Sequence, residues 1–328
     1  MKKYFMLFIF SNILLFSQNP PFNGNGDGSI GNPYQLWTIG HLIELNDSTY
    51  NDYWYNAPLC FHCGKYFKLM ENIDGVTTQI VGWYFSGHFN GNGKKITANM
   101  NYPLFGALQN GGTIDNLILD GYIYSDDISI AGILGSIYTG GVISNCINNA
   151  TIICTDDGSK YGHYGKGAIV AIILSSTVSV INCINNGDIT GVDRIGGIAG
   201  ENDGTIINCI NTGNITATAS GDNSIFSGVG GIVGTVANYC QSISNCVNLG
   251  SVVGQGFVGG IVGLARGMGG PAPPTPITNC INYGYVRGIN GVGGILGYMF
   301  NQYVNVSNCV NVGVVEGEED IGSIVGKE

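Results

Sequence analysis

Apolar residues along this chain recur in short runs of Ile and Val that are separated by Gly and Asn. Runs of this composition between turn-forming residues predict β-strands. One motif, Asn-Cys-(Ile/Val)-Asn-x-Gly, recurs among these runs and occurs six times with Ala150 as its single departure. The copies span residues 145–150, 182–187, 208–213, 245–250, 279–284 and 308–313.

A second motif, (Gly/Ala)-x-Ile-(Val/Ala/Leu)-(Gly/Ala/Ser), alternates with the first between residues 131 and 326. The shortest full repeat, from Cys183 to Cys209, is 26 residues long. A unit of this length cannot bury its own apolar face, whereas units stacked in register can. We therefore predict an all-β chain folded as a parallel β-helix, or β-solenoid, of about nine coils.

The chain divides into three predicted parts. Residues 1–17 combine Lys2 and Lys3 with an apolar run, as a secretory signal peptide does, and no other stretch approaches a membrane span. Residues 18–64 form a leader and N-terminal cap that includes a short helical stretch at 38–46, and residues 65–328 form the β-helix, with the clearest repeats over 112–326. We expect the mature protein outside the cytoplasm, secreted or at the cell surface.

In a stack of coils each motif position becomes a column of identical residues. The Asn side-chain amides can form hydrogen bonds from coil to coil. Gly is expected at corners where the backbone needs positive φ or where two backbone segments approach closely. The Ile of the second motif is expected in the core. Either Cys or the residue after it can face inward. The six motif cysteines are expected to be buried free thiols, because their parallel Cβ vectors disfavour disulfides between neighbouring coils, which remain the alternative. They are Cys146, Cys183, Cys209, Cys246, Cys280 and Cys309.

These repeats resemble the GLUG-motif repeat of bacterial secreted and surface proteins. The resemblance rests on Gly-x-Ile-x-Asn-Cys-x-Asn-x-Gly-x-Ile followed by Val-Gly-Gly-Ile-Val-Gly, and it extends over about residues 26 to 326 through the segments 28–34, 67–74 and 85–93. It implies a right-handed parallel β-helix in secreted or surface-bound material, often adhesin-like. It implies no catalytic activity.

Composition narrows the function. Twelve basic against 22 acidic residues give a net charge of −10, which argues against nucleic-acid binding. The pair Cys60 and Cys63 encloses His62, but a second ligand pair at zinc-site spacing is missing, so we expect a local disulfide or two thiols. Residues 23–28 resemble half of a calcium loop and lack its final carboxylate. We therefore expect neither a metal nor a cofactor.

Repeat spacing indicates where a ligand could bind. The Cys-to-Gly leg is 13 residues in four repeats but 21 after Cys146 and after Cys209. The resulting insertions, near 155–166 and 216–227, should leave one edge of the solenoid on either side of the short loop 192–195, and so form a groove. Solvated insertions without a ligand are the alternative. The expected lining residues are Tyr161, His163, Tyr164, Asp193, Arg194 and Phe226. A third insertion, 266–276, is expected on a different edge.

The predicted function is that of a non-catalytic, adhesin-like interaction module that binds a glycan or a host or surface protein. One alternative is a carbohydrate-active β-helix enzyme, a lyase or hydrolase, which would need two acids or an acid and a base facing the groove. The other is a structural part of a larger surface assembly. The last coil carries no evident cap, which leaves two alternatives: protection by the final charges Lys327 and Glu328, or end-to-end self-association through the C-terminal coil.

Overall fold

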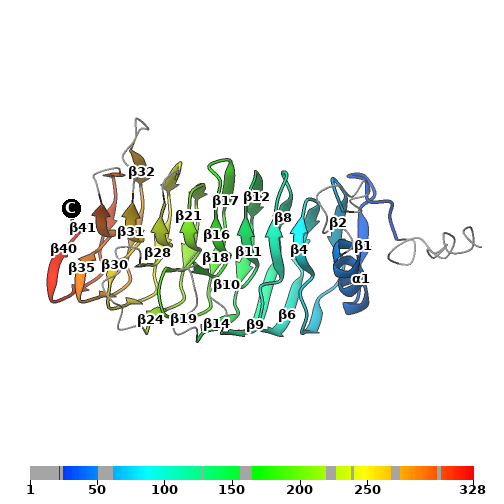
Figure 1. Ribbon diagram of the computed structural model, residues 1–328, viewed down its shortest axis with the longest axis horizontal. Coiled ribbons are helices and arrows are strands. Elements are labelled where there is room, and N and C mark those ends of the chain that lie inside the picture. Colours follow the sequence, from blue (N-terminus) through cyan, green and yellow to red (C-terminus); the bar gives the residue numbers. More distant parts are fainter. Residues whose placement is uncertain are drawn as a thin grey trace, which may run out of the picture.

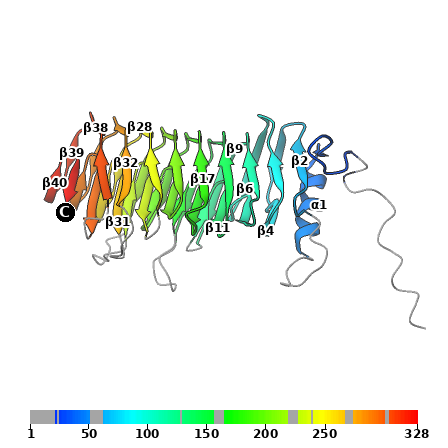
Figure 2. The ribbon, with the colours of Figure 1, turned by 90° about the horizontal axis from the view of Figure 1, so that it is seen from above.

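The computed structural model describes residues 22, 25–50, 62–126, 129–155, 165–218, 227–237, 240–266, 274–300 and 304–328. These residues form a rod of stacked strands with the helix α1 (Ile39–Tyr50) at one end and the C-terminus at the other (Figure 1). Figure 2 shows the same stack from above, with α1 again at the end of the rod. Among the described residues, no helix is long and apolar enough to cross a membrane.

The strands belong to four sheets, and every pairing between them is parallel. The ten-stranded sheet contains β1 (Tyr34–Leu36), β2 (Tyr66–Leu69), β5 (His88–Asn90), β8 (Thr113–Asp115), β12 (Gly141–Ser144), β17 (Val178–Ile181), β22 (Thr205–Ile207), β27 (Ser242–Ser244), β32 (Thr275–Thr278) and β37 (Val304–Ser307). The nine-stranded sheet contains β4 (Val81–Phe85), β7 (Phe105–Leu108), β11 (Leu134–Ile137), β16 (Val170–Ile173), β21 (Ala199–Asn202), β26 (Val233–Val236), β31 (Val262–Arg266), β36 (Leu296–Phe300) and β41 (Val325–Lys327).

The other two sheets complete each coil. The seven-stranded sheet contains β10 (Ile130–Ala131), β15 (Lys166–Gly167), β20 (Ile195–Gly196), β25 (Gly228–Gly230), β30 (Phe257–Gly259), β35 (Asn290–Gly293) and β40 (Glu319–Gly322). The fifteen-stranded sheet contains β3 (Ile73–Val76), β6 (Lys95–Met100), β9 (Ile118–Ser125), β13 (Ile147–Asn148), β14 (Thr151–Cys154), β18 (Ile184–Asn185), β19 (Ile189–Gly191), β23 (Ile210–Asn211), β24 (Ile215–Ala217), β28 (Val247–Asn248), β29 (Val252–Val253), β33 (Ile281–Asn282), β34 (Val286–Arg287), β38 (Val310–Asn311) and β39 (Val315–Glu316).

Each repeat crosses the sheets in a fixed order. After β17 of the ten-stranded sheet come β18 and β19 of the fifteen-stranded sheet, then β20, then β21, and β22 begins the next coil beside β17. The predicted parallel β-helix with a short N-terminal helix is confirmed. Helix α1 packs against β3 and β4 at the start of the stack.

The six motif cysteines point into the core. Cys146, Cys183 and their counterparts through Cys280 are fully buried, and Cys309 packs partly buried against the core. The residue after each cysteine faces outward, so the orientation that the sequence left open is settled. All six are free thiols, as predicted. The Ile of the second motif is also buried, from Ile133 to Ile295, and Ile324 packs against the core of the last coil.

The two Asn positions of the motif have different structural roles. The second Asn is buried in all coils but the last, and its amides form a continuous ladder, for example from Asn185 Nδ2 to Asn211 Oδ1 at 2.7 Å and from Asn211 Nδ2 to Asn248 Oδ1 at 2.8 Å. The first Asn is exposed and adopts positive φ in every repeat, with Asn208 at 56°. Asn tolerates this left-handed conformation better than other residues with a side chain. The predicted Asn ladder is confirmed.

The motif glycines serve close approach rather than positive φ. A Cβ on Gly213 would sit against the carbonyl oxygen of Gly187, and one on Gly234 against the backbone of Arg194 and Ile195. The second contact joins two sheets. Strands of the seven-stranded sheet turn back and pack on the outer face of the nine-stranded sheet, where a side chain at Gly234 would keep them apart.

Candidate functional site

The groove predicted between the two insertions is only partly described. Tyr161, His163, Tyr164 and Phe226 lie outside the described residues, so their place in a groove stays a prediction. Asp193 and Arg194 are described, in the turn between β19 and β20. They are 7% and 8% exposed. We expected both side chains to line an open groove. Instead they are buried, because each is held in an ion pair.

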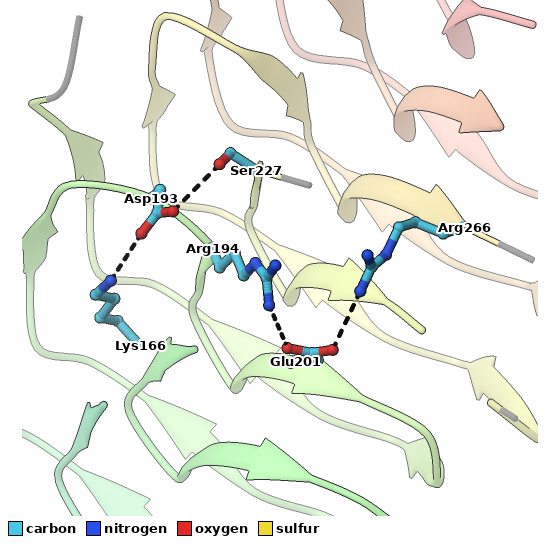
Figure 3. Close-up of polar contacts among 6 residues, drawn as sticks. All are labelled: Lys166, Asp193, Arg194, Glu201, Ser227 and Arg266. Atoms are coloured by element: carbon cyan, nitrogen blue, oxygen red, sulfur yellow. Dashed lines mark hydrogen bonds and ion pairs between the residues drawn. The ribbon is translucent and has the colours of Figure 1, made fainter. Parts of the chain in front are cut away.

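Lys166 is the partner of Asp193. It occupies the first position of β15, in register with Ile130 on one side and Ile195 on the other, and it is 1% exposed. Its Nζ lies 2.8 Å from Asp193 Oδ1 (Figure 3). Ser227 donates from its hydroxyl to Asp193 Oδ2 at 3.2 Å. A lysine thus replaces an aliphatic residue in a core column, and the carboxylate of the following coil neutralises it.

A second ion-paired group adjoins the first. Glu201 projects from β21 onto the outer face of the nine-stranded sheet, where its column neighbours Ile172 and Thr235 are buried. Arg194 Nη1 lies 2.7 Å from Glu201 Oε2, and Arg266 Nη2 lies 3.4 Å from Glu201 Oε1 (Figure 3). Burial, and then the nearby positive charge of Arg194, lower the pKa of Arg266.

Arg266 is the first residue of the insertion 266–276. This insertion follows the nine-stranded sheet, whereas the other two follow the fifteen-stranded sheet, yet Arg266 belongs to the same network as Arg194 and Glu201. The reason is the packing of two sheets. Because strands of the seven-stranded sheet fold back on the nine-stranded sheet, the residues that precede β20 lie close to the ends of β21 and β31. Residues at the bases of three insertions, namely Lys166, Ser227 and Arg266, therefore meet at one corner (Figure 3).

All four carboxylate oxygens of this network are engaged. Lys166 and Ser227 occupy the two oxygens of Asp193, and Arg194 and Arg266 occupy the two of Glu201. Each of the two acids is thus held by two partners. The network is suited to holding the bases of the insertions in fixed positions.

Sequence reasoning found Asp193 and Arg194 and missed their partners. Lys166 had a visible signal, because the residue before the second motif is Ile or Val in the other copies, and a lysine there breaks the column. Glu201 and Arg266 had none. Their contact spans 65 residues and depends on how closely two sheets pack.

The described residues contain no group of three or more His, Cys, Asp and Glu side chains that could hold a metal ion. Cys63 is disulfide-bonded. His62 beside it is buried, stacks on Phe85 with ring centroids 5.5 Å apart, and accepts a hydrogen bond on Nδ1 from the Ser86 amide at 3.2 Å. Burial lowers the pKa of His62 to about 4, so the ring is neutral at pH 7. His62 is a core residue of the first coils.

Neither a protein-family model nor a curated protein matches the sequence. Two solved structures share the fold. One, from Bacteroides ovatus, is described as a candidate immunoglobulin A1 protease; it has a TM-score of 0.54 and 19% identity over 90% of this chain and 80% of its own. The other is described as an IgA1 protease, with a TM-score of 0.56 and 15% identity over 88% of this chain and 23% of its own. At these identities the likeness establishes the parallel β-helix fold alone.

Proposed function

We propose that this protein is a non-catalytic β-helical interaction module, secreted or displayed on a bacterial surface, that binds a glycan or a surface protein. The observation that carries the proposal is the state of the two acids at the corner of the insertions. Asp193 and Glu201 have all their oxygens in ion pairs or hydrogen bonds, and breaking those contacts would leave charges buried without partners. This arrangement favours a structural role for the two acids over acid–base chemistry.

The structural likenesses are consistent with a module. In the structure described as an IgA1 protease, the match covers 23% of the chain, so most of that protein lies outside the region that resembles this chain. The resemblance to GLUG-motif repeats and the apolar N-terminal run support secretion and surface display.

Two assays on the purified protein test the absence of catalysis. We expect no release of reducing sugar from acidic or neutral polysaccharides and no cleavage of IgA1, the substrate suggested by the names of the two neighbours. The Asp193→Asn variant is the matched control, since it keeps the side-chain size and removes the carboxylate. Turnover by the wild-type protein would refute the proposal, and its loss in an Asp193→Asn variant that circular dichroism shows to be folded would assign the activity to Asp193.

Binding is tested separately with a glycan array and a panel of surface proteins. Retention of at least one of them by the folded full-length chain is the expected result. A chain that binds nothing on either panel would favour the structural-assembly alternative. That outcome is independent of the turnover assays.

A further inference from the structure

A groove lies far from the ion-pair network, on the outer face of the ten-stranded sheet near the N-terminal end. Its volume is about 480 Å³. The floor is formed by β2, β5 and β8, and the turn around Ile30 and Pro33 forms a wall. Alternate residues of these strands face outward, because Phe67 and Phe89 between them point into the core.

The floor consists of two columns of polar side chains. Strand pairing places Tyr66, His88 and Thr113 in register in one column, and Lys68, Asn90 and Asp115 in the other. Neighbouring members of a column are therefore about 4.8 Å apart along the rod. The floor presents hydroxyl, imidazole, ammonium, amide and carboxylate groups, and so offers both donors and acceptors.

Contacts within the protein fix several of these side chains in place. The Tyr66 and His88 rings stack with centroids 4.3 Å apart and an interplanar angle of 24°. His88 Nδ1 lies 3.0 Å from Thr113 Oγ1. Burial lowers the pKa of His88, so the ring is neutral at pH 7. Asp115 Oδ1 accepts hydrogen bonds from Ser144 Oγ at 2.7 Å and Asn145 Nδ2 at 2.8 Å. The groove is thus preorganised.

Other polar atoms of the floor remain available to a ligand. Within the described ranges, the Tyr66 hydroxyl and the Lys68 ammonium make no hydrogen bond or ion pair, and Asp115 Oδ2 accepts none. An oriented carboxylate oxygen next to free donors suits a ligand that carries many hydroxyl groups. Ile30 and Pro33 give the wall an apolar surface, whereas the outward side chains of the floor carry polar groups.

The spacing of the columns also distinguishes a sugar chain from a peptide. A pyranose ring that is linked through its opposite ends spans roughly one strand spacing of about 4.8 Å. An extended peptide advances about 3.3 Å per residue and falls out of step with the strands. A glycan that runs along the rod therefore contacts one pair of floor residues with each sugar ring. The groove volume is that of a typical small-molecule site and accommodates about two or three rings.

We propose that this groove binds an oligosaccharide along the rod axis, with its hydroxyl groups on Asp115, Asn90 and Tyr66 and with Lys68 as a charged donor. The inference rests on the proposed function, because it names the ligand class and the surface of a binding module. A sugar that bears a carboxylate would bind more tightly than a neutral one if that group lies against Lys68.

Titration calorimetry on the full-length protein tests the inference with chitotriose, sialyllactose and trigalacturonate, and with an extended polar hexapeptide. We expect binding of at least one trisaccharide and not of the peptide. Asp115→Asn and Lys68→Met should each raise the Kd at least tenfold, since each removes a charge-assisted hydrogen bond. Two separate variants guard against the failure of one to fold, which circular dichroism would reveal.

Thr205→Ala is the matched control, because Thr205 lies in the same outward column on β22, outside the groove. Its Kd should equal that of the wild-type protein. Trisaccharide binding that survives both groove variants, tighter binding of the hexapeptide, or no binding of the three trisaccharides would each overturn the inference. None of these outcomes by itself refutes the proposed binding function. That function is refuted only if the protein binds nothing on the broader glycan array and the protein panel.

Discussion

The first coils and the repeat coils fill the same kind of core in different ways. In the first coils, Phe67, Phe85, Phe89 and Phe105 pack ring against ring, with centroids of Phe89 and Phe105 5.1 Å apart. In the repeat coils, columns of Cys, Ile and Asn repeat with little change. Each aromatic ring packs against its own set of neighbours, whereas a column requires the same residue type in every coil. The first coils are thus freer to vary their outer face, and there the polar groove occurs.

In the repeat coils, one departure from an aliphatic column is matched by a charged partner. Lys166 breaks an aliphatic column and is matched by Asp193. The comparison therefore yields a rule for this molecule. A residue that breaks a column in the repeat region should matter strongly for stability, and a polar residue on the face of the first coils should matter for binding.

The largest effect is expected for Lys166. Replacing it by Met leaves the buried Asp193 carboxylate without its cation, and loss of one partner of a buried pair costs about 3–5 kcal/mol. The double variant Lys166→Met, Asp193→Asn should recover most of this loss, because it removes both charges. Urea unfolding of the two single variants and the double variant gives the coupling energy. Simple additivity would mean that the two side chains do not interact.

A smaller effect is expected in the Asn ladder. Asn211→Ala removes the acceptor for Asn185 and the donor to Asn248, and leaving buried polar groups unsatisfied costs about 1–3 kcal/mol. The matched variant is Asn208→Gly, three residues away. Exposed Asn208 belongs to a second Asn ladder, in which its Nδ2 donates to Asn182 Oδ1 at 3.1 Å, and Gly retains its positive φ. It should cost less than about 0.5 kcal/mol. Equal midpoints of urea unfolding for the two variants would contradict the distinction between the ladders.

The repeats made most of the fold predictable. Six copies of one motif imply stacking, and the columns of Cys, Asn and Ile follow from it. The direction of the Cys side chain could not be derived, because Cys and the Ile after it are both apolar. The use of Gly for close approach depends on how tightly two sheets pack, which alternation of residues does not reveal.

The site was less predictable for a related reason. Insertion lengths located the corner of the insertions, but the Glu201–Arg266 contact joins positions that are distant in sequence and close only because one sheet folds onto another. The groove near Tyr66 and Asp115 lies in coils that lack the six-copy motif. Without a repeat to align them, its two columns become visible only from strand pairing.

The last expected effect is spread over a range of pH and concerns the first coils. Burial lowers the pKa of His62 from 6.5 to about 4, so protonation favours the unfolded chain, which binds the proton more readily. His62 therefore supplies stability above pH 6.5 that is lost as the pH falls toward 4, at up to about 1.4 kcal/mol per pH unit. The free energy of unfolding, measured by urea titration from pH 7.5 to 4.5, should show this slope.

His62→Gln isolates the contribution. Gln has no titrating group, and its side-chain oxygen can still accept the hydrogen bond from the Ser86 amide. The variant should be less stable than the wild-type protein at pH 7.5 through lost packing on Phe85, and the two should converge as the pH falls. Parallel pH profiles for the two proteins would show that His62 is not protonated on unfolding in this range. In that case the aromatic packing of the first coils would contribute to stability independently of pH.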